Sequence, residues 1–242
     1  MTQSINTPIG YRQLVALNKQ LHRFALAKER SYQFCAHINA LPLVISEFPL
    51  ACHAYPIVFV SAAGKTGYGA AAVTGLKADQ NLFCDAEGAW RANTYIPAYA
   101  RAYPFCLATV IDDDKPRTDK MVCIAAEAVA ENGQELFAED GEPTALWRGT
   151  EKLLQEYEND TARTAAMCKE LKNMGLLKEF GIQATNASKE NFSLTGMVCV
   201  DEAALAKLSA AQFRKLINEG WMEKIYAHLI SLRNFQALAG NA

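Results

Sequence analysis

Four acidic or imidazole side chains are the candidates for acid–base chemistry in this sequence. Glu47 lies in the apolar run Leu43–Leu50, and burial in such a run raises the pKa of a carboxyl group toward the range used by a general acid or base. His53, Asp85 and His228 are the other three candidates. An enzyme acting on a peptide or an amino-acid-like metabolite could use them.

Two of these residues also have a structural interpretation. Glu47 could be a buried carboxylate that is satisfied by Arg91, by Arg101 or by backbone N–H groups. His228 follows Ile225 by three residues, so it lies on or beside the apolar face of a helix, where a hydrogen-bonded core histidine is expected. Both interpretations stay open at this point.

Two cysteines and two histidines between residues 35 and 53 have the side chains of a zinc site. They are Cys35, His37, Cys52 and His53. Their spacings, C-x-H and an adjacent C-H, are not those of a zinc finger, and adjacent helical residues point about 100° apart. The sequence therefore predicts ordinary packing and no metal. All seven cysteines are dispersed without a CxxC pair, as is typical of reduced thiols in a cytosol.

The segment Gly88–Phe105 is rich in aromatic side chains, with tyrosines spaced by four residues. Trp, Tyr and Arg are enriched at the centres of protein interfaces. The candidate contact residues for a protein or peptide client are Trp90, Tyr95, Tyr99, Arg101 and Tyr103. The alternative is an aromatic wedge in the core, with Arg101 paired to a carboxylate.

Composition excludes several classes of function. The 24 Lys and Arg residues are balanced by 26 Asp and Glu residues without a basic cluster, so nucleic acid is not a predicted partner. The most apolar stretches, such as Pro56–Ala63, are shorter than the roughly 20 residues of a membrane span. Gly64-Lys65-Thr66 lacks the upstream glycine of a phosphate-binding loop, and we predict no cofactor. The N-terminus has no signal-peptide pattern, which predicts a cytoplasmic location.

We expect residues 1–242 to form a single α+β domain with a mostly antiparallel central sheet and a helical C-terminal third. The predicted strands are Pro56–Ser61, Gly67–Gly75, Asn81–Asp85, Phe105–Ile111, Lys120–Ala126 and Phe192–Val200. Helical spacing begins at Pro143, and Asn159-Asp160 is expected to divide that region into two helices, with Asp160 as a cap. Asp201 and the pair Ser209 and Gln212 are expected to cap later helices, and Trp221–Leu238 to form the last one.

The chain resembles the bacterial SapC family through ordered motifs that run along nearly its whole length. In the aromatic segment they are Trp90, Tyr95-Ile96-Pro97-Ala98-Tyr99 and Arg101-x-Tyr103-Pro104-Phe105. Elsewhere they include Pro42-Leu43-Val44, Glu47-Phe48, Tyr55-Pro56-Ile57-Val58-Phe59, Asp140-Gly141-Glu142-Pro143, Val200-Asp201-Glu202 and Ala227-His228-Leu229. The family pattern often has two adjacent basic residues where this chain has Arg101-Ala102.

The family takes its name from genes associated with surface-layer protein production and export, and relatives are linked with outer-membrane nutrient-uptake loci. No reaction is established for the family, so the resemblance supplies no catalytic residues. It implies a cytoplasmic accessory role. Together with the aromatic and arginine side chains of the segment Gly88–Phe105, this setting leads to the hypothesis of a non-catalytic protein that binds a protein or peptide client. The competing hypotheses are the enzyme described above and a subunit that completes another enzyme's site.

Overall fold

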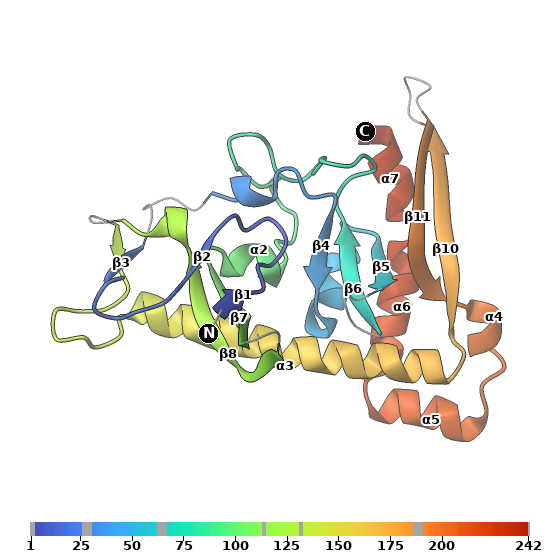
Figure 1. Cartoon of the computed structure of the whole chain (residues 1–242). Coiled ribbons are helices and arrows are strands. Elements are labelled where there is room, and N and C mark those ends of the chain that lie inside the picture. Colours follow the sequence, from blue (N-terminus) through green and yellow to red (C-terminus); the bar gives the residue numbers. More distant parts are fainter. Residues whose placement is uncertain are drawn as a thin grey trace.

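Antiparallel strands form two main sheets, and one long helix runs past both of them (Figure 1). The computed structural model describes residues 3–25, 31–61, 67–112, 115–130, 133–185 and 191–241. The predicted α+β class, the antiparallel strands and the helical C-terminal third are confirmed, with the strands divided between the two sheets. Gly64-Lys65-Thr66 lies outside the described residues.

The first sheet has four strands in the order β1-β7-β8-β2. They are β1 (Gln3–Ile5), β2 (Leu14–Ala16), β7 (Phe105–Asp112) and β8 (Lys115–Ala125). The second sheet has five strands in the order β10-β11-β5-β6-β4. They are β4 (Ala40–Leu43), β5 (Ile57–Ser61), β6 (Tyr68–Val73), β10 (Leu177–Thr185) and β11 (Asn191–Val200). Two short strands, β3 (Phe24–Ala25) and β9 (Gln134–Glu135), pair separately.

The strand predicted over Asn81–Asp85 is wrong. The segment is a turn in which the Asn81 side chain accepts a hydrogen bond from the N–H of Phe83 and donates one to the carbonyl of Cys35. Asn side chains compete with strand ladders in this way because they bond to nearby backbone groups. The segment keeps one isolated bridge, between Cys84 and Trp90.

The helix α3 (Ala145–Asn173) is continuous, so the predicted break at Asn159-Asp160 is wrong. Thr144 caps its first turn by accepting a hydrogen bond from the N–H of Trp147. Asp160 does not cap a second helix, because its carboxylate pairs with Arg163 one turn later, at 2.7 Å. Asp160 and its neighbours therefore lie on the surface of an unbroken helix.

The remaining helices are short. They are α1 (Phe48–Ala51), α2 (Ala98–Ala102), α4 (Glu202–Leu205), α5 (Ala210–Asn218), α6 (Trp221–Ser231), α7 (Asn234–Asn241) and the 3-10 turns η1 (Gln33–Cys35), η2 (Ile45–Glu47) and η3 (Ala126–Ala128). The predicted caps at Asp201 and Ser209 are confirmed. The prediction of a single last helix over Trp221–Leu238 is wrong, because α6 and α7 are two separate helices. The side-chain amide of Asn234, at the start of α7, donates to the carbonyls of Cys52 and Tyr55.

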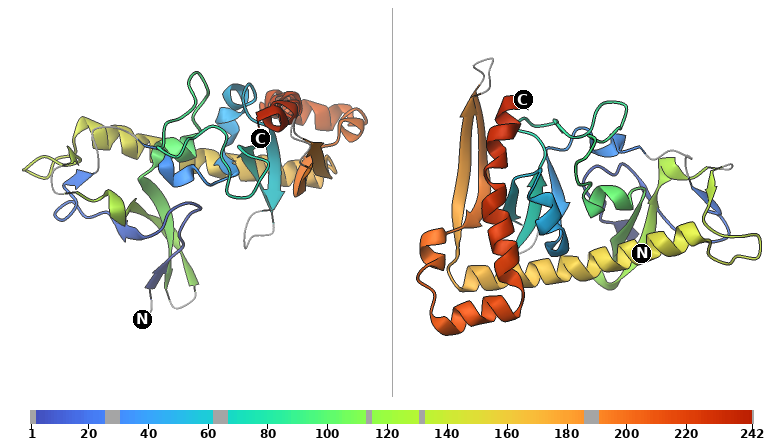
Figure 2. Two further views of the ribbon diagram at one scale, coloured as in Figure 1. Left: turned by 90° about the horizontal axis from the view of Figure 1, so that it is seen from above. Right: turned by 180° about the vertical axis from the view of Figure 1, so that it is seen from behind.

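The apolar side chains form two core clusters, and α3 contributes to both. Its first half places Trp147 and Leu154 in the cluster with the first sheet. Its second half places Met167 and Leu171 in the cluster with the second sheet. Both views in Figure 2 show the helix crossing between the two halves of the molecule. The polar middle of α3 therefore lies between the two core clusters.

Candidate functional site

A polar cleft opens beside the middle of α3, and its most buried polar side chain is Glu47. One carboxylate oxygen of Glu47 accepts hydrogen bonds from the N–H of Ala98 (2.6 Å) and the hydroxyl of Tyr95 (3.0 Å). The other oxygen accepts from the N–H of Val44 (2.9 Å). Glu47 thus joins η2 to the loop before α2 and to the start of α2. The interpretation of a carboxylate satisfied by backbone N–H groups matches this geometry.

The pKa of Glu47 is raised, chiefly because burial penalises its charged form. The two backbone hydrogen bonds, the Tyr95 hydroxyl and the charge of Arg101 favour the charged form and offset part of this increase. Burial, and then the neighbouring Glu47, also raise the pKa of Tyr95 to about 12. Tyr95 therefore remains a neutral hydroxyl that donates to Glu47 at physiological pH.

Arg101 is half-buried in the same cleft and is held in place by neutral acceptors. Its Nε–H donates to the carbonyl of Ile96 (3.0 Å), and one terminal nitrogen donates to the Tyr95 hydroxyl (3.1 Å). Among the described residues Arg101 forms no ion pair, and its positive charge acts on Glu47 without a direct contact, because the Tyr95 hydroxyl bonds both groups. Its charge is thus positioned but not neutralised by a direct contact.

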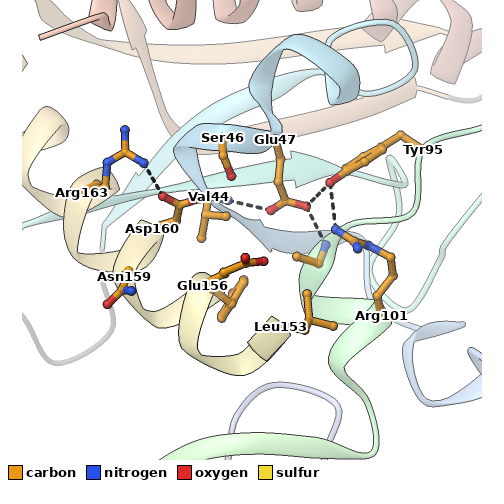
Figure 3. A pocket seen from close by; sticks show the side chains of 12 residues that line it. Val44, Ser46, Glu47, Tyr95, Arg101, Leu153, Glu156, Asn159, Asp160 and Arg163 are labelled. Atoms are coloured by element: carbon orange, nitrogen blue, oxygen red, sulfur yellow. Dashed lines mark hydrogen bonds and ion pairs between the residues drawn. The ribbon is translucent and has the colours of Figure 1, made fainter. Parts of the chain in front are cut away.

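The Arg101 cleft, as we name it, has a volume of about 450 Å³. It is lined by Val44, Ser46, Glu47, Tyr95, Ala98, Arg101, Leu153, Glu156, Tyr157, Asn159, Asp160 and Arg163. Figure 3 shows Glu156 projecting from α3 between Arg101 and Asp160. On the same helix, Thr164 accepts a hydrogen bond from the N–H of Ile45 (2.8 Å), which fixes α3 against η2.

Sequence reasoning missed the α3 side of this cleft. Asn159 and Asp160 were assigned to a helix break, and Glu156 and Arg163 were not considered. Counted from Glu156, the other three residues follow by three, four and seven positions, which places all four on one face of a continuous helix. That helical spacing was the feature of the sequence that could have predicted this side of the cleft.

Of the four acid–base candidates, only Glu47 lines the Arg101 cleft. His228 is completely buried in the core, where Nδ1–H donates to the carbonyl of Ile57 (2.8 Å) and Nε2 accepts from the N–H of Val200 (3.1 Å). Burial lowers the pKa of His228 to about 4. Asp85 accepts from the N–H of Ala89 in a tight turn, and His53 is exposed beyond α1. The structure does not bring these four groups together.

The aromatic segment serves mainly as a wedge between the two cores. Trp90 packs against both clusters and donates to the Tyr55 hydroxyl (3.2 Å). Tyr99 is buried and donates to the carbonyl of Ile9 (2.5 Å), and Tyr103 stacks on Phe34 at 4.0 Å. Of the five candidate contact residues, Tyr95 and Arg101 line the cleft and the other three pack elsewhere.

The candidate metal ligands are also separated. Cys35 and Cys52 belong to different core clusters, His37 contacts the carbonyl of Asp79, and His53 is exposed. Among the described residues no group of three His, Cys, Asp or Glu side chains is arranged to hold a metal ion. All seven cysteines are free and buried.

The comparisons with known proteins place the chain in one family. A family model described as SapC matches residues 17–238, and the chain belongs to the SapC family. No curated protein and no solved structure matches the chain significantly. In the described part of the chain, every helix is too short or too polar to span a bilayer.

Proposed function

We propose that this SapC-family chain is a non-catalytic accessory protein that binds a peptide segment of a protein client in the Arg101 cleft. The observation that carries the proposal is the guanidinium of Arg101, which is half-buried and fixed by neutral acceptors, with no ion-pair partner among the described residues. A fixed arginine fork is suited to pairing with a carboxylate of a ligand.

The cleft has the size and lining that a peptide segment requires. Its volume of about 450 Å³ falls in the usual range of ligand pockets, roughly 300–1,000 Å³. Leu153 and Val44 provide apolar contact area, while Ser46 and Asn159 provide groups that can bond to a peptide backbone. This mixed lining supports a peptide more than a purely apolar ligand.

The engagement of Glu47 supports binding over catalysis. A general base needs a lone pair that can reach a substrate proton. Glu47 already accepts three hydrogen bonds, and they tie together segments that are about fifty residues apart in the sequence. We therefore assign Glu47 the role of positioning Tyr95 and α2, and through them Arg101.

The family setting supports an accessory role in the cytoplasm. The resemblance described above links SapC relatives with the production and export of surface-layer proteins and with outer-membrane nutrient uptake. We propose that the client is a protein bound for the cell surface, which the chain binds before export.

Affinity capture from an extract of the native cell, membranes included, tests the proposal. The baits are the tagged wild type, Arg101→Gln and the matched control Arg148→Gln, whose side chain is exposed on α3 outside the cleft. We expect the same protein with the wild type and the control, and its loss with Arg101→Gln. Equal recovery by all three folded baits would contradict the proposal. Recovery of no protein would favour small-molecule chemistry.

A further inference from the structure

A second cavity shares the Tyr157 side chain with the Arg101 cleft and has a mostly apolar lining. It has a volume of about 190 Å³ and lies between α3, α2 and β7, with Leu154, Phe105 and Leu107 among its lining residues. Tyr11 and Tyr99 also line it, but their hydroxyls donate to the carbonyls of Phe105 and Ile9. These two tyrosines therefore present ring faces, not free polar groups. We name this space the Leu154 cavity.

The Leu154 cavity is large enough for one aromatic or large aliphatic side chain. An apolar protein cavity of about 150 Å³ accommodates a benzene ring. At its edge, Lys120 and Glu158 form an ion pair of 2.6 Å, so neither charge there needs a ligand for neutralisation. An apolar group is the ligand that fits this lining.

Tyr157 is the wall shared by the two spaces, since its half-buried side chain lines both. Its hydroxyl has no hydrogen-bond partner among the residues that the structure describes. Burial raises the pKa of Tyr157, so the hydroxyl stays protonated and can donate to a ligand. A ligand that occupies the cleft and the cavity together must therefore lie against this side chain.

From this geometry we infer that the site binds the C-terminal residue of its client when that residue has a large apolar side chain. The terminal carboxylate pairs with Arg101, the amide N–H donates to Glu156, and the side chain enters the Leu154 cavity. This inference rests on the proposed function, because it specifies the peptide that the Arg101 cleft accepts.

The arrangement of charges favours a chain terminus over an internal acidic residue. Arg101 has no ion-pair partner among the described residues, and Glu156, whose Lys152 contact is a long 3.8 Å, is an acceptor that lines the same cleft. A C-terminal residue carries a carboxylate, an N–H and a side chain on one Cα atom. An internal Asp or Glu places its carboxylate on its side chain, so the apolar group must come from another residue.

Peptide binding followed by ¹⁵N–¹H NMR titration tests the inference. The probes are acetyl-trialanyl-phenylalanine as the free acid, the same peptide as its C-terminal amide, and acetyl-tetraalanine as the free acid. A fourth probe, an amidated peptide with an internal aspartate before phenylalanine, supplies the other source of a carboxylate. The Nε–H signal of Arg101 reports occupancy of the cleft.

We expect the phenylalanine free acid to bind at least about tenfold more tightly than each other probe. A hydrogen bond to a charged group and a buried phenylalanine each contribute roughly 1.5–3 kcal/mol, which is a factor of about ten or more. Arg101→Gln should abolish the preference for acid over amide. Thr161→Trp, at the exposed rim of the cavity, should abolish only the preference for phenylalanine over alanine, whereas the control Ala165→Trp should keep both.

Three outcomes would overturn the inference: equal binding of the acid and the amide, equal binding of the aspartate peptide, or no binding of any probe. These failures are distinct from failure of the proposed function. A client lost on Arg101→Gln in the capture experiment would keep the proposed function, and only the assignment of a C-terminal apolar residue would fall.

Discussion

The regions around Glu47 and His228 both bury a titratable side chain that bonds to backbone groups, but they differ in what surrounds it. His228 lies in the core between α6, β5 and β11, where its two nitrogens have backbone partners and Phe59 packs against the ring. Glu47 also has its partners, but the neighbouring Arg101 stays unpaired and borders an open cleft.

A buried titratable group is therefore not by itself the mark of a binding site. His228 is neutral, and its interactions are completed within the core. The Glu47 carboxylate already accepts hydrogen bonds from the protein. Its partner Tyr95 also accepts one from Arg101, and Arg101 is the charged group that remains able to pair with a ligand. Arg101, which has no direct ion-pair partner among the described residues, is therefore more informative about ligand binding than either buried titratable group.

Replacement of Glu47 tests the first region and should have the largest effect on stability. Glu47→Ala leaves the N–H groups of Val44 and Ala98 and the Tyr95 hydroxyl without their acceptor, and should lower the free energy of unfolding by about 3 kcal/mol. Urea denaturation measures the change. The control Glu156→Ala, on the exposed surface of α3, should change it by less than about 0.5 kcal/mol. A loss below about 1 kcal/mol for Glu47→Ala would disprove the positioning role.

The pH dependence of stability should reveal His228 next. The unfolded imidazole gains a proton below its ordinary pKa of about 6.5, whereas the folded one stays neutral until about pH 4. Stability therefore decreases as pH falls through this window, by up to about 3 kcal/mol. The non-titrating variant His228→Asn should lose this part of the pH dependence, and the control His53→Asn should keep it. An identical pH slope in the wild type and His228→Asn would contradict the account.

Glu47 should make the stability depend on pH with a sign opposite to that of His228. Its folded pKa is raised, so between its ordinary value of about 4.5 and the higher folded value the folded state retains a proton that the unfolded state has lost. Its contribution to stability therefore declines as pH rises from about 4.5. The stability difference between the wild type and Glu47→Gln, measured by urea denaturation at several pH values, should shrink over this range. A constant difference up to pH 8 would refute this sign.

The smallest expected effect on stability comes from the Tyr95 hydroxyl, which lies between the Glu47 carboxylate and the Arg101 guanidinium. Tyr95→Phe removes the hydroxyl that bonds both groups, and should lower the free energy of unfolding by about 1 kcal/mol. Thermal denaturation measures the change. Tyr103→Phe is the matched control, because the Tyr103 hydroxyl bonds the exposed side chain of Glu127 and should matter less. Equal shifts for the two variants would mean that Tyr95 has no special linking role.

Local patterns predicted much of the fold. The strand at Pro56–Ser61, the capping box at Ser209 and the cap at Asp201 depend on neighbouring residues, and all are confirmed. The break at Asn159-Asp160 was wrong because a residue pair typical of caps lies on a long helix whose two halves are held by separate cores. Tertiary packing there outweighs the local preference.

The site was only partly predictable, for a related reason. The apolar run predicted Glu47 as a candidate site residue, and the aromatic segment predicted Tyr95 and Arg101. In the structure these three side chains form one hydrogen-bonded chain. Nothing local shows that α3 closes the cleft, because that contact joins residues far apart in the sequence, as in the bond from Ile45 to Thr164, which are 119 positions apart. Composition also cannot distinguish Tyr99, which is buried, from Tyr95, which lines the cleft.

The most direct test of the central claim is photo-cross-linking from the cleft in the native cell. A photoreactive amino acid replaces Asn159, which lines the cleft, or Lys169, an exposed position further along α3. We predict a client peptide cross-linked at position 159 and absent at 169, which disappears when Arg101→Gln is added. The same adducts at both positions, or an adduct at 159 that is unaffected by Arg101→Gln, would contradict binding in the Arg101 cleft.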